Sequence, residues 1–121
     1  MRRELLQWYG LFGAALAWAG QHVVVFGVAS ADCLNASRHW GLDVTTWVIV
    51  CSAIGLLCAA VAEVAALSIL LETRALEYED PPPGGRHHFF AFGAALGNVL
   101  FIMAIVLNAV GTLASQGCRP A

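Results

Sequence analysis

One carboxylate, Glu63, lies inside an otherwise uncharged apolar run from Val44 to Leu71. A carboxylate within a membrane-spanning segment costs about 2.5–3.5 kcal/mol on insertion scales, so it needs either a function or a partner. Its functional interpretation is a group that carries a proton or binds a cation. Its structural interpretation is a glutamate that locks helix packing by a hydrogen bond to Asn98. Because the segment holds no second charge, we favour the structural interpretation.

His22 is a candidate haem ligand, proton relay or interface residue. A six-coordinate haem needs a second axial ligand at the same depth, and Met103 is the conventional candidate that the other apolar runs offer. No CxxCH motif for covalent haem attachment occurs in the sequence. We therefore expect His22 to hydrogen-bond to a neighbouring subunit, and we expect this chain alone to bind no haem.

Two further groups resemble metal ligands in type but not in spacing. His87 and His88 are adjacent, so on a helix they point in different directions and serve one metal ion poorly. We expect them to contact lipid head groups or a partner. Cys33, Asp32 and His39 lack the second cysteine within two to four residues that a closed zinc site uses. The sequence therefore predicts no metal site.

Sequence motifs of self-sufficient enzymes are absent. The chain has no phosphate-binding loop, nucleophile elbow, HExxH motif or dinucleotide fingerprint. We expect a protein without catalytic residues or a cofactor of its own, although lipid can bind it. Its formal net charge of −2 gives no basis for binding nucleic acid.

The candidate residues must be positioned by membrane helices. Hydrophobic residues make up 60% of the chain and charged residues 12%, against about 25% charged residues in soluble domains. Three apolar runs, at about residues 8–31, 44–71 and 89–114, are each long enough to cross a hydrocarbon core of about 30 Å. A polar connector, residues 72–88, separates the last two. We predict an all-α integral membrane protein with three transmembrane helices in a single domain, residues 1–121.

The N-terminal run also has features of a signal peptide. Arg2 and Arg3 precede it, and Ala29-Ser30-Ala31 offers small residues for cleavage. The run is longer than the usual apolar region of 7–15 residues, so we expect a retained first helix.

Small residues recur at three- and four-residue steps on all three runs. They are Gly10, Gly13, Ala17, Gly20 and Gly27, then Ser52, Gly55, Ala59, Ala62 and Ala66, then Gly93, Gly97, Ala104 and Gly111. Such faces let helix backbones approach closely in lipid. Three such faces are more contact surface than three helices need to pack against each other, which indicates a partner. Trp18 and His22, on another side of the first helix, are the predicted docking residues.

The arginines predict the orientation. Four lie on one side of a three-span arrangement and two on the other: Arg2, Arg3, Arg74 and Arg86 against Arg38 and Arg119. The positive-inside rule then places the N-terminus in the cytoplasm and the C-terminus outside. Cys33 and Cys118 both fall on the outer side. In a bacterial periplasm they are free to form a disulfide that ties the first and third helices together.

The chain also resembles a family of known context. The motifs that carry the resemblance are AWAGQHVV at residues 17–24, the ADC turn at 31–33, the PPPGGR connector at 81–86 and the late Cys118. These motifs resemble those of small multi-span proteins encoded beside haem–copper cytochrome c oxidase subunits in bacterial respiratory operons. The resemblance implies an accessory subunit in the bacterial inner membrane that carries no redox centre itself.

Two other functions fit the same residues. One is a small homo-oligomeric channel or proton-coupled carrier that uses Glu63. The other is a membrane assembly factor that associates transiently and uses its outer cysteines as thiols.

Overall fold

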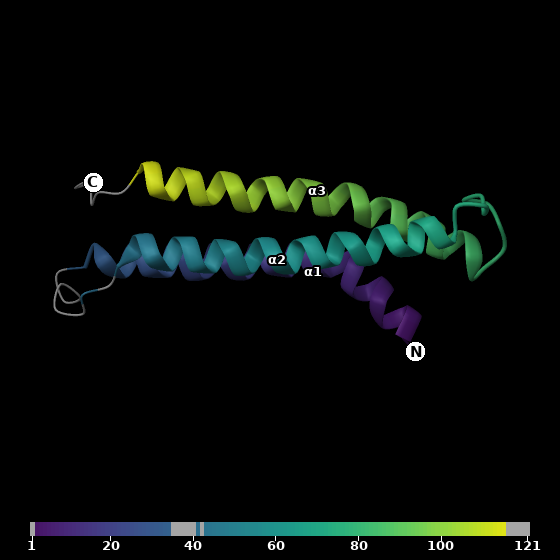
Figure 1. The fold of residues 1–121 in the computed structure, drawn as a ribbon, viewed down its shortest axis with the longest axis horizontal. Helices are drawn as coiled ribbons and strands as arrows, with labels where there is room; N and C mark the ends of the chain where they lie inside the picture. The colour runs from purple at the N-terminus through teal and green to yellow at the C-terminus, as the bar shows by residue number, and fades with distance from the viewer. Residues whose placement is uncertain (1, 35–40, 42, 116–121) are drawn as a thin grey trace.

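The fold is a bundle of three long helices, seen in a computed structural model that describes residues 2–34, 41 and 43–115. They are α1 (Arg2–Asp32), α2 (Val44–Glu72) and α3 (Gly84–Ala114). The helices run alternately up and down, so that the start of α1, the end of α2 and the start of α3 meet at one end (Figure 1). Each helix is long and apolar enough to cross a membrane. The predicted all-α fold with three spanning helices is confirmed.

The observed helices extend beyond two of the apolar runs. α1 begins at Arg2, and its first turns diverge from the other two helices (Figure 1). α3 begins at Gly84, because Pro83 at the N-cap already has helical angles of φ −88° and ψ −8°. The Gly-Gly-Arg-His-His stretch assigned to the connector is therefore the first turn of a helix, which positions Arg86 and His87.

Both ends of α2 are capped by side chains. The Asp43 carboxylate accepts a hydrogen bond from the Thr46 backbone N–H at 3.4 Å. The hydrogen bond from the Thr46 hydroxyl lowers the pKa of the Asp43 carboxyl group below its usual value, and the bond from the Thr46 backbone N–H adds to this effect. At the other end the Thr73 hydroxyl donates to the Ile69 carbonyl oxygen at 2.8 Å. The helix therefore begins at the start of the apolar run and ends at its end.

Two glycines set the distance between α1 and α2. A Cβ atom on Gly10 would lie 3.1 Å from the backbone nitrogen of Ala66, and one on Gly13 would lie 2.9 Å from the Cβ of Ala62. Both glycines are buried. The neighbouring core consists of Ala14, Ala59, Ala62 and Ile105. The α1–α2 contact therefore has the smooth, close packing that the small-residue pattern predicts.

A layer of polar side chains links all three helices. The Gln21 amide on α1 donates to the Ser52 hydroxyl on α2 at 3.1 Å, and its carbonyl oxygen accepts from Asn108 on α3 at 2.9 Å. Gln21 and Ser52 are buried. Such bonds contribute about 0.6–1.7 kcal/mol each between membrane helices. Gln21 was not singled out for this role in the sequence.

The connector between α2 and α3 is short and folds tightly on the helix ends. Nδ1 of His88 lies 3.0 Å from the Thr73 hydroxyl oxygen. A Cβ on Gly85 would collide with the carbonyl oxygen of Asp80, so a glycine is required there. The Tyr78 ring lies against His88, with ring centroids 5.1 Å apart. The two helices are thus joined as a hairpin.

The glycine contacts give a matched pair of substitutions. Gly13→Ala should destabilise the bundle by about 1–3 kcal/mol, because the new methyl group overpacks against Ala62. Gly20→Ala should leave stability unchanged or raise it by up to about 1 kcal/mol, because a Cβ at Gly20 meets nothing within 4 Å and alanine favours the helix. Thermal unfolding in detergent, followed by circular dichroism, measures both. Equal effects of the two substitutions would contradict this packing.

Candidate functional site

Glu63 lies half-buried on α2, and its Oε2 atom is enclosed without a hydrogen-bond partner. It is the one buried side-chain nitrogen or oxygen atom without a partner among the described residues. The sequence suggested Asn98 as its partner, and this is wrong. The Asn98 amide instead donates to the Gly10 carbonyl oxygen at 2.9 Å.

The close α1–α2 packing explains this exchange of partners. Gly10 has no side chain to cover its backbone, so its carbonyl oxygen is open to a donor from α3. Asn98 is only 1% exposed and would otherwise bury an unsatisfied amide. Asn98 is therefore a structural residue that joins α3 to α1, and Glu63 remains a separate, unsatisfied polar group.

Trp18 and His22 stack on each other on α1, with ring centroids 5.7 Å apart. The two residues differ in their surroundings. Trp18 is half-buried, packs against the core and lies 5.8 Å from the Phe101 ring on α3. His22 is exposed. Of the two predicted docking residues, Trp18 thus forms part of the α1–α3 contact, and His22 is the one open to another molecule.

The structure divides the small-residue faces into used and unused parts. Gly10, Gly13 and Gly55 each face a neighbouring helix at close range. At the other glycines in these faces an added Cβ would meet nothing within 4 Å: Gly20, Gly27, Gly93, Gly97 and Gly111. The GxxxG pair of α3 is therefore unused inside the bundle. Asn98, next to Gly97, bonds to Gly10, whereas Gln21, next to His22, bonds to Asn108. The open face, Gly93 with Gly97, therefore lies level with the first part of α1 and at a different depth from His22.

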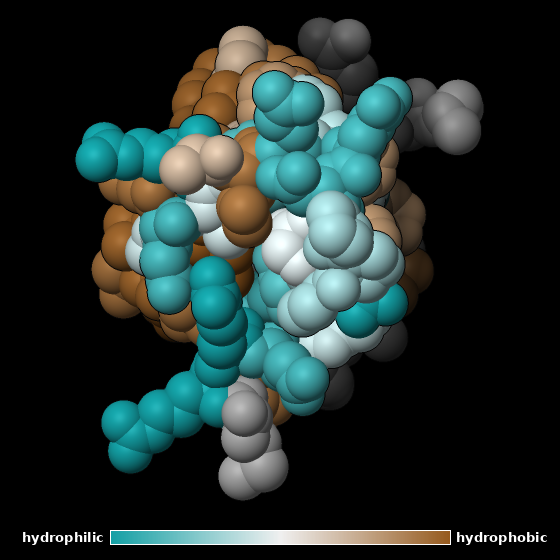
Figure 2. Space-filling view, turned by 90° about the vertical axis from the view of Figure 1, so that its right-hand side faces the viewer, coloured by the Kyte–Doolittle hydropathy of each residue, from teal (hydrophilic) through white to brown (hydrophobic). Residues whose placement is uncertain are grey.

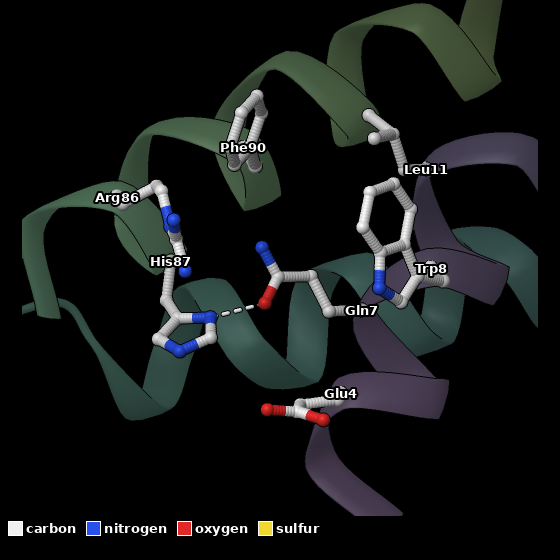
Figure 3. A pocket seen from close by; sticks show the side chains of 7 residues that line it. All are labelled: Glu4, Gln7, Trp8, Leu11, Arg86, His87 and Phe90. Atoms are coloured by element: carbon white, nitrogen blue, oxygen red, sulfur yellow. Dashed lines mark hydrogen bonds between the residues drawn. The ribbon is translucent and has the colours of Figure 1, made fainter. Parts of the chain in front are cut away.

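A pocket of about 310 Å³ lies at the end where α1 and α3 begin (Figure 3). Its lining comprises Glu4, Gln7, Trp8, Leu11, Arg86, His87 and Phe90. A hydrogen bond between Gln7 and His87 crosses it. Figure 2 views this end of the molecule, where hydrophilic side chains gather in front of apolar flanks. We call this site the end pocket. The sequence analysis named Arg86, His87 and His88 but not Glu4 or Gln7, which lie before the expected start of the first helix at about residue 8.

The cysteines fall into two groups. Cys51 and Cys58 are free thiols on α2. Cys33 is engaged in a disulfide. Cys118 lies outside the described residues, so its pairing with Cys33 stays a prediction.

Within residues 2–34, 41 and 43–115 there is no group of three or more His, Cys, Asp or Glu residues that could hold a metal ion. His39 lies outside these residues.

Comparisons with known proteins identify no family. No protein-family model, curated protein or solved structure matches the chain. The site therefore has to be interpreted from its own geometry.

The isolated Glu63 oxygen predicts a gain of stability when the carboxylate is removed. Glu63→Leu should raise the free energy of unfolding by about 1–3 kcal/mol, because it removes an enclosed polar atom that has no partner. Glu63→Gln, which keeps a polar group of similar shape, should change it less. Unfolding of both variants in detergent checks this. A loss of stability in Glu63→Leu would show that Glu63 makes a favourable contact.

Proposed function

We propose that this chain is a non-catalytic accessory subunit of a larger membrane complex, spanning a bacterial inner membrane with its N-terminus in the cytoplasm and its C-terminus in the periplasm. The observations that support it are the open face of Gly93 and Gly97 on α3 and, at a different depth of the bundle, the exposed His22 on α1. In lipid there is no hydrophobic driving force between helices, so contacts depend on close packing and hydrogen bonds. Glycines that face outward provide such a contact surface for another helix.

The stacked pair of Trp18 and His22 offers a second contact for a partner. Trp18 is held by Phe101, which fixes the ring on which His22 stacks. An exposed imidazole in a fixed orientation can hydrogen-bond to a polar group on a partner helix. The bundle thus offers a smooth surface for close approach on α3 and, separately, one oriented polar group on α1.

An aerobic haem–copper cytochrome c oxidase is the proposed complex. Its support is the resemblance at residues 17–24, 31–33 and 81–86. In this proposal the larger subunits carry the haems and copper. This chain contributes packing surface to the electron-transport complex and no redox centre.

The open glycine face can be tested by adding bulk to it. Gly97→Leu should reduce co-purification with the oxidase subunits at least tenfold, because the leucine side chain separates the two backbones. The bundle itself should stay folded, since a Cβ at Gly97 meets nothing within 4 Å. Quantitative mass spectrometry after mild detergent extraction measures the bound proteins.

The matched control is Ala60→Leu, which adds similar bulk at an exposed position of α2. It should leave co-purification unchanged. His22→Ala should weaken co-purification without affecting the unfolding of the isolated chain. The docking face is refuted if Gly97→Leu and Ala60→Leu retain the same partners in the same amounts.

The enclosed Oε2 of Glu63 favours a second candidate, a proton-coupled carrier or homo-oligomeric channel. Ionisable residues inside membrane helices often mark ion or proton pathways. In that case the purified chain in liposomes should conduct protons, and Glu63→Gln should abolish the flux. An accessory subunit should give no flux above that of empty liposomes.

A further inference from the structure

The end pocket has charged groups of both signs that are not neutralised by each other. Arg86 and Glu4 both line it, and both side chains are exposed. Among the described residues the ion pair is formed elsewhere, between Arg3 and Glu72 at 3.4 Å. Figure 3 shows the Arg86 and Glu4 side chains on either side of the Gln7–His87 hydrogen bond. The pocket therefore offers one cation and one anion at separate positions.

The start of α3 adds positive potential on the Arg86 side. Arg86 lies in the first turn of this helix, and no side chain caps its N-terminus. The dipole of a helix favours an anion near its N-terminus, where Arg86 lies. Guanidinium groups bind phosphate oxygens with paired hydrogen bonds. This side of the pocket fits a phosphate group.

The remaining wall is apolar and continuous with the membrane-facing surface. Trp8, 60% exposed, stacks on Phe12 with ring centroids 5.6 Å apart. Leu11 and Phe90 complete this wall. Tryptophan is typical of the depth at which lipid head groups meet hydrocarbon chains. A ligand that spans the pocket is thus zwitterionic at one end and apolar at the other.

We propose that the end pocket binds a phospholipid whose head group carries a phosphate and a primary ammonium group, as phosphatidylethanolamine does. Arg86 and the start of α3 hold the phosphate, and the Glu4 carboxylate accepts hydrogen bonds from the ammonium group. The glycerol and acyl chains lie along Trp8, Leu11 and Phe90. The Gln7–His87 hydrogen bond joins the α1 and α3 sides of the site. This proposal does not depend on the docking face, which lies further along α3.

The site can be tested on the full chain in detergent by native mass spectrometry. The probes are phosphatidylethanolamine, phosphatidylglycerol and diacylglycerol with the same acyl chains, together with soluble glycerophosphoethanolamine. Phosphatidylethanolamine should bind best, phosphatidylglycerol about tenfold more weakly because it lacks the ammonium group, and diacylglycerol least. Glycerophosphoethanolamine should not displace the lipid, because it lacks the apolar part.

Two variants separate the charges. Arg86→Gln should weaken both phospholipids about tenfold, through loss of a charge-assisted hydrogen bond to phosphate. Glu4→Gln should lower binding of phosphatidylethanolamine to the level of phosphatidylglycerol and leave phosphatidylglycerol unchanged. The matched controls are Arg74→Gln and Glu79→Gln, exposed residues of the connector outside the pocket lining, which should change nothing. Circular dichroism confirms that each variant is folded.

Each contrary result overturns a stated part of the proposal. Equal binding of the two phospholipids, or a preference that survives Glu4→Gln, excludes recognition of the ammonium group. Equal losses in Arg74→Gln and Arg86→Gln reduce the effect to general surface charge. Displacement by glycerophosphoethanolamine assigns the pocket to a soluble phosphate compound and excludes the lipid.

Discussion

The contact of Gly10 and Gly13 with Ala66 and Ala62 is the constraint on which the rest of the bundle depends. It brings two helix backbones together where any larger side chain would separate them. It also leaves the Gly10 carbonyl oxygen open, and Asn98 uses that oxygen to attach α3. One pair of glycines thus determines both the close pairing of α1 with α2 and the position of the third helix.

Polar groups inside the bundle show how costly such groups are in lipid. Gln21 uses both ends of its amide, and Asn98 finds a backbone carbonyl, so each is bonded. Glu63 is the exception, with an enclosed oxygen that has no partner. Because hydrocarbon offers no water to replace a missing bond, this difference separates the residues that hold the bundle from the residue that calls for a functional explanation.

The number and approximate extent of the helices could be predicted from hydropathy, because an apolar run long enough to span a bilayer has few alternatives. The helix ends could not. Residues 2–7 carry two arginines and a glutamate, and residues 84–88 are glycine, arginine and histidine, yet both stretches are helical. The end pocket is built partly from these segments. Arg86 and His87 were named in the sequence analysis, but the pattern did not place them next to Glu4 and Gln7.

The sequence also could not predict which of the small residues contact another helix. The repeat marks which helix faces are smooth, but not which of them lie inside the bundle. Gly13 and Gly20 look alike in the pattern, yet only the first meets another helix at close range. Likewise the depth of Glu63 and Asn98 suggested a bond between them, whereas the rotation of α3 directs Asn98 to Gly10. Such choices depend on how the helices turn about their own axes.

The tight turn between α2 and α3 has a consequence for biosynthesis. The hydrogen bond between His88 and Thr73 and the close fit of Gly85 against the Asp80 carbonyl oxygen hold the two helix ends together. A connection so short gives the ribosome-bound chain little freedom to place one helix without the other, which favours their insertion as a pair. The first helix, which is synthesised before them, meets this pair through a surface of glycine against alanine that allows close approach of the backbones.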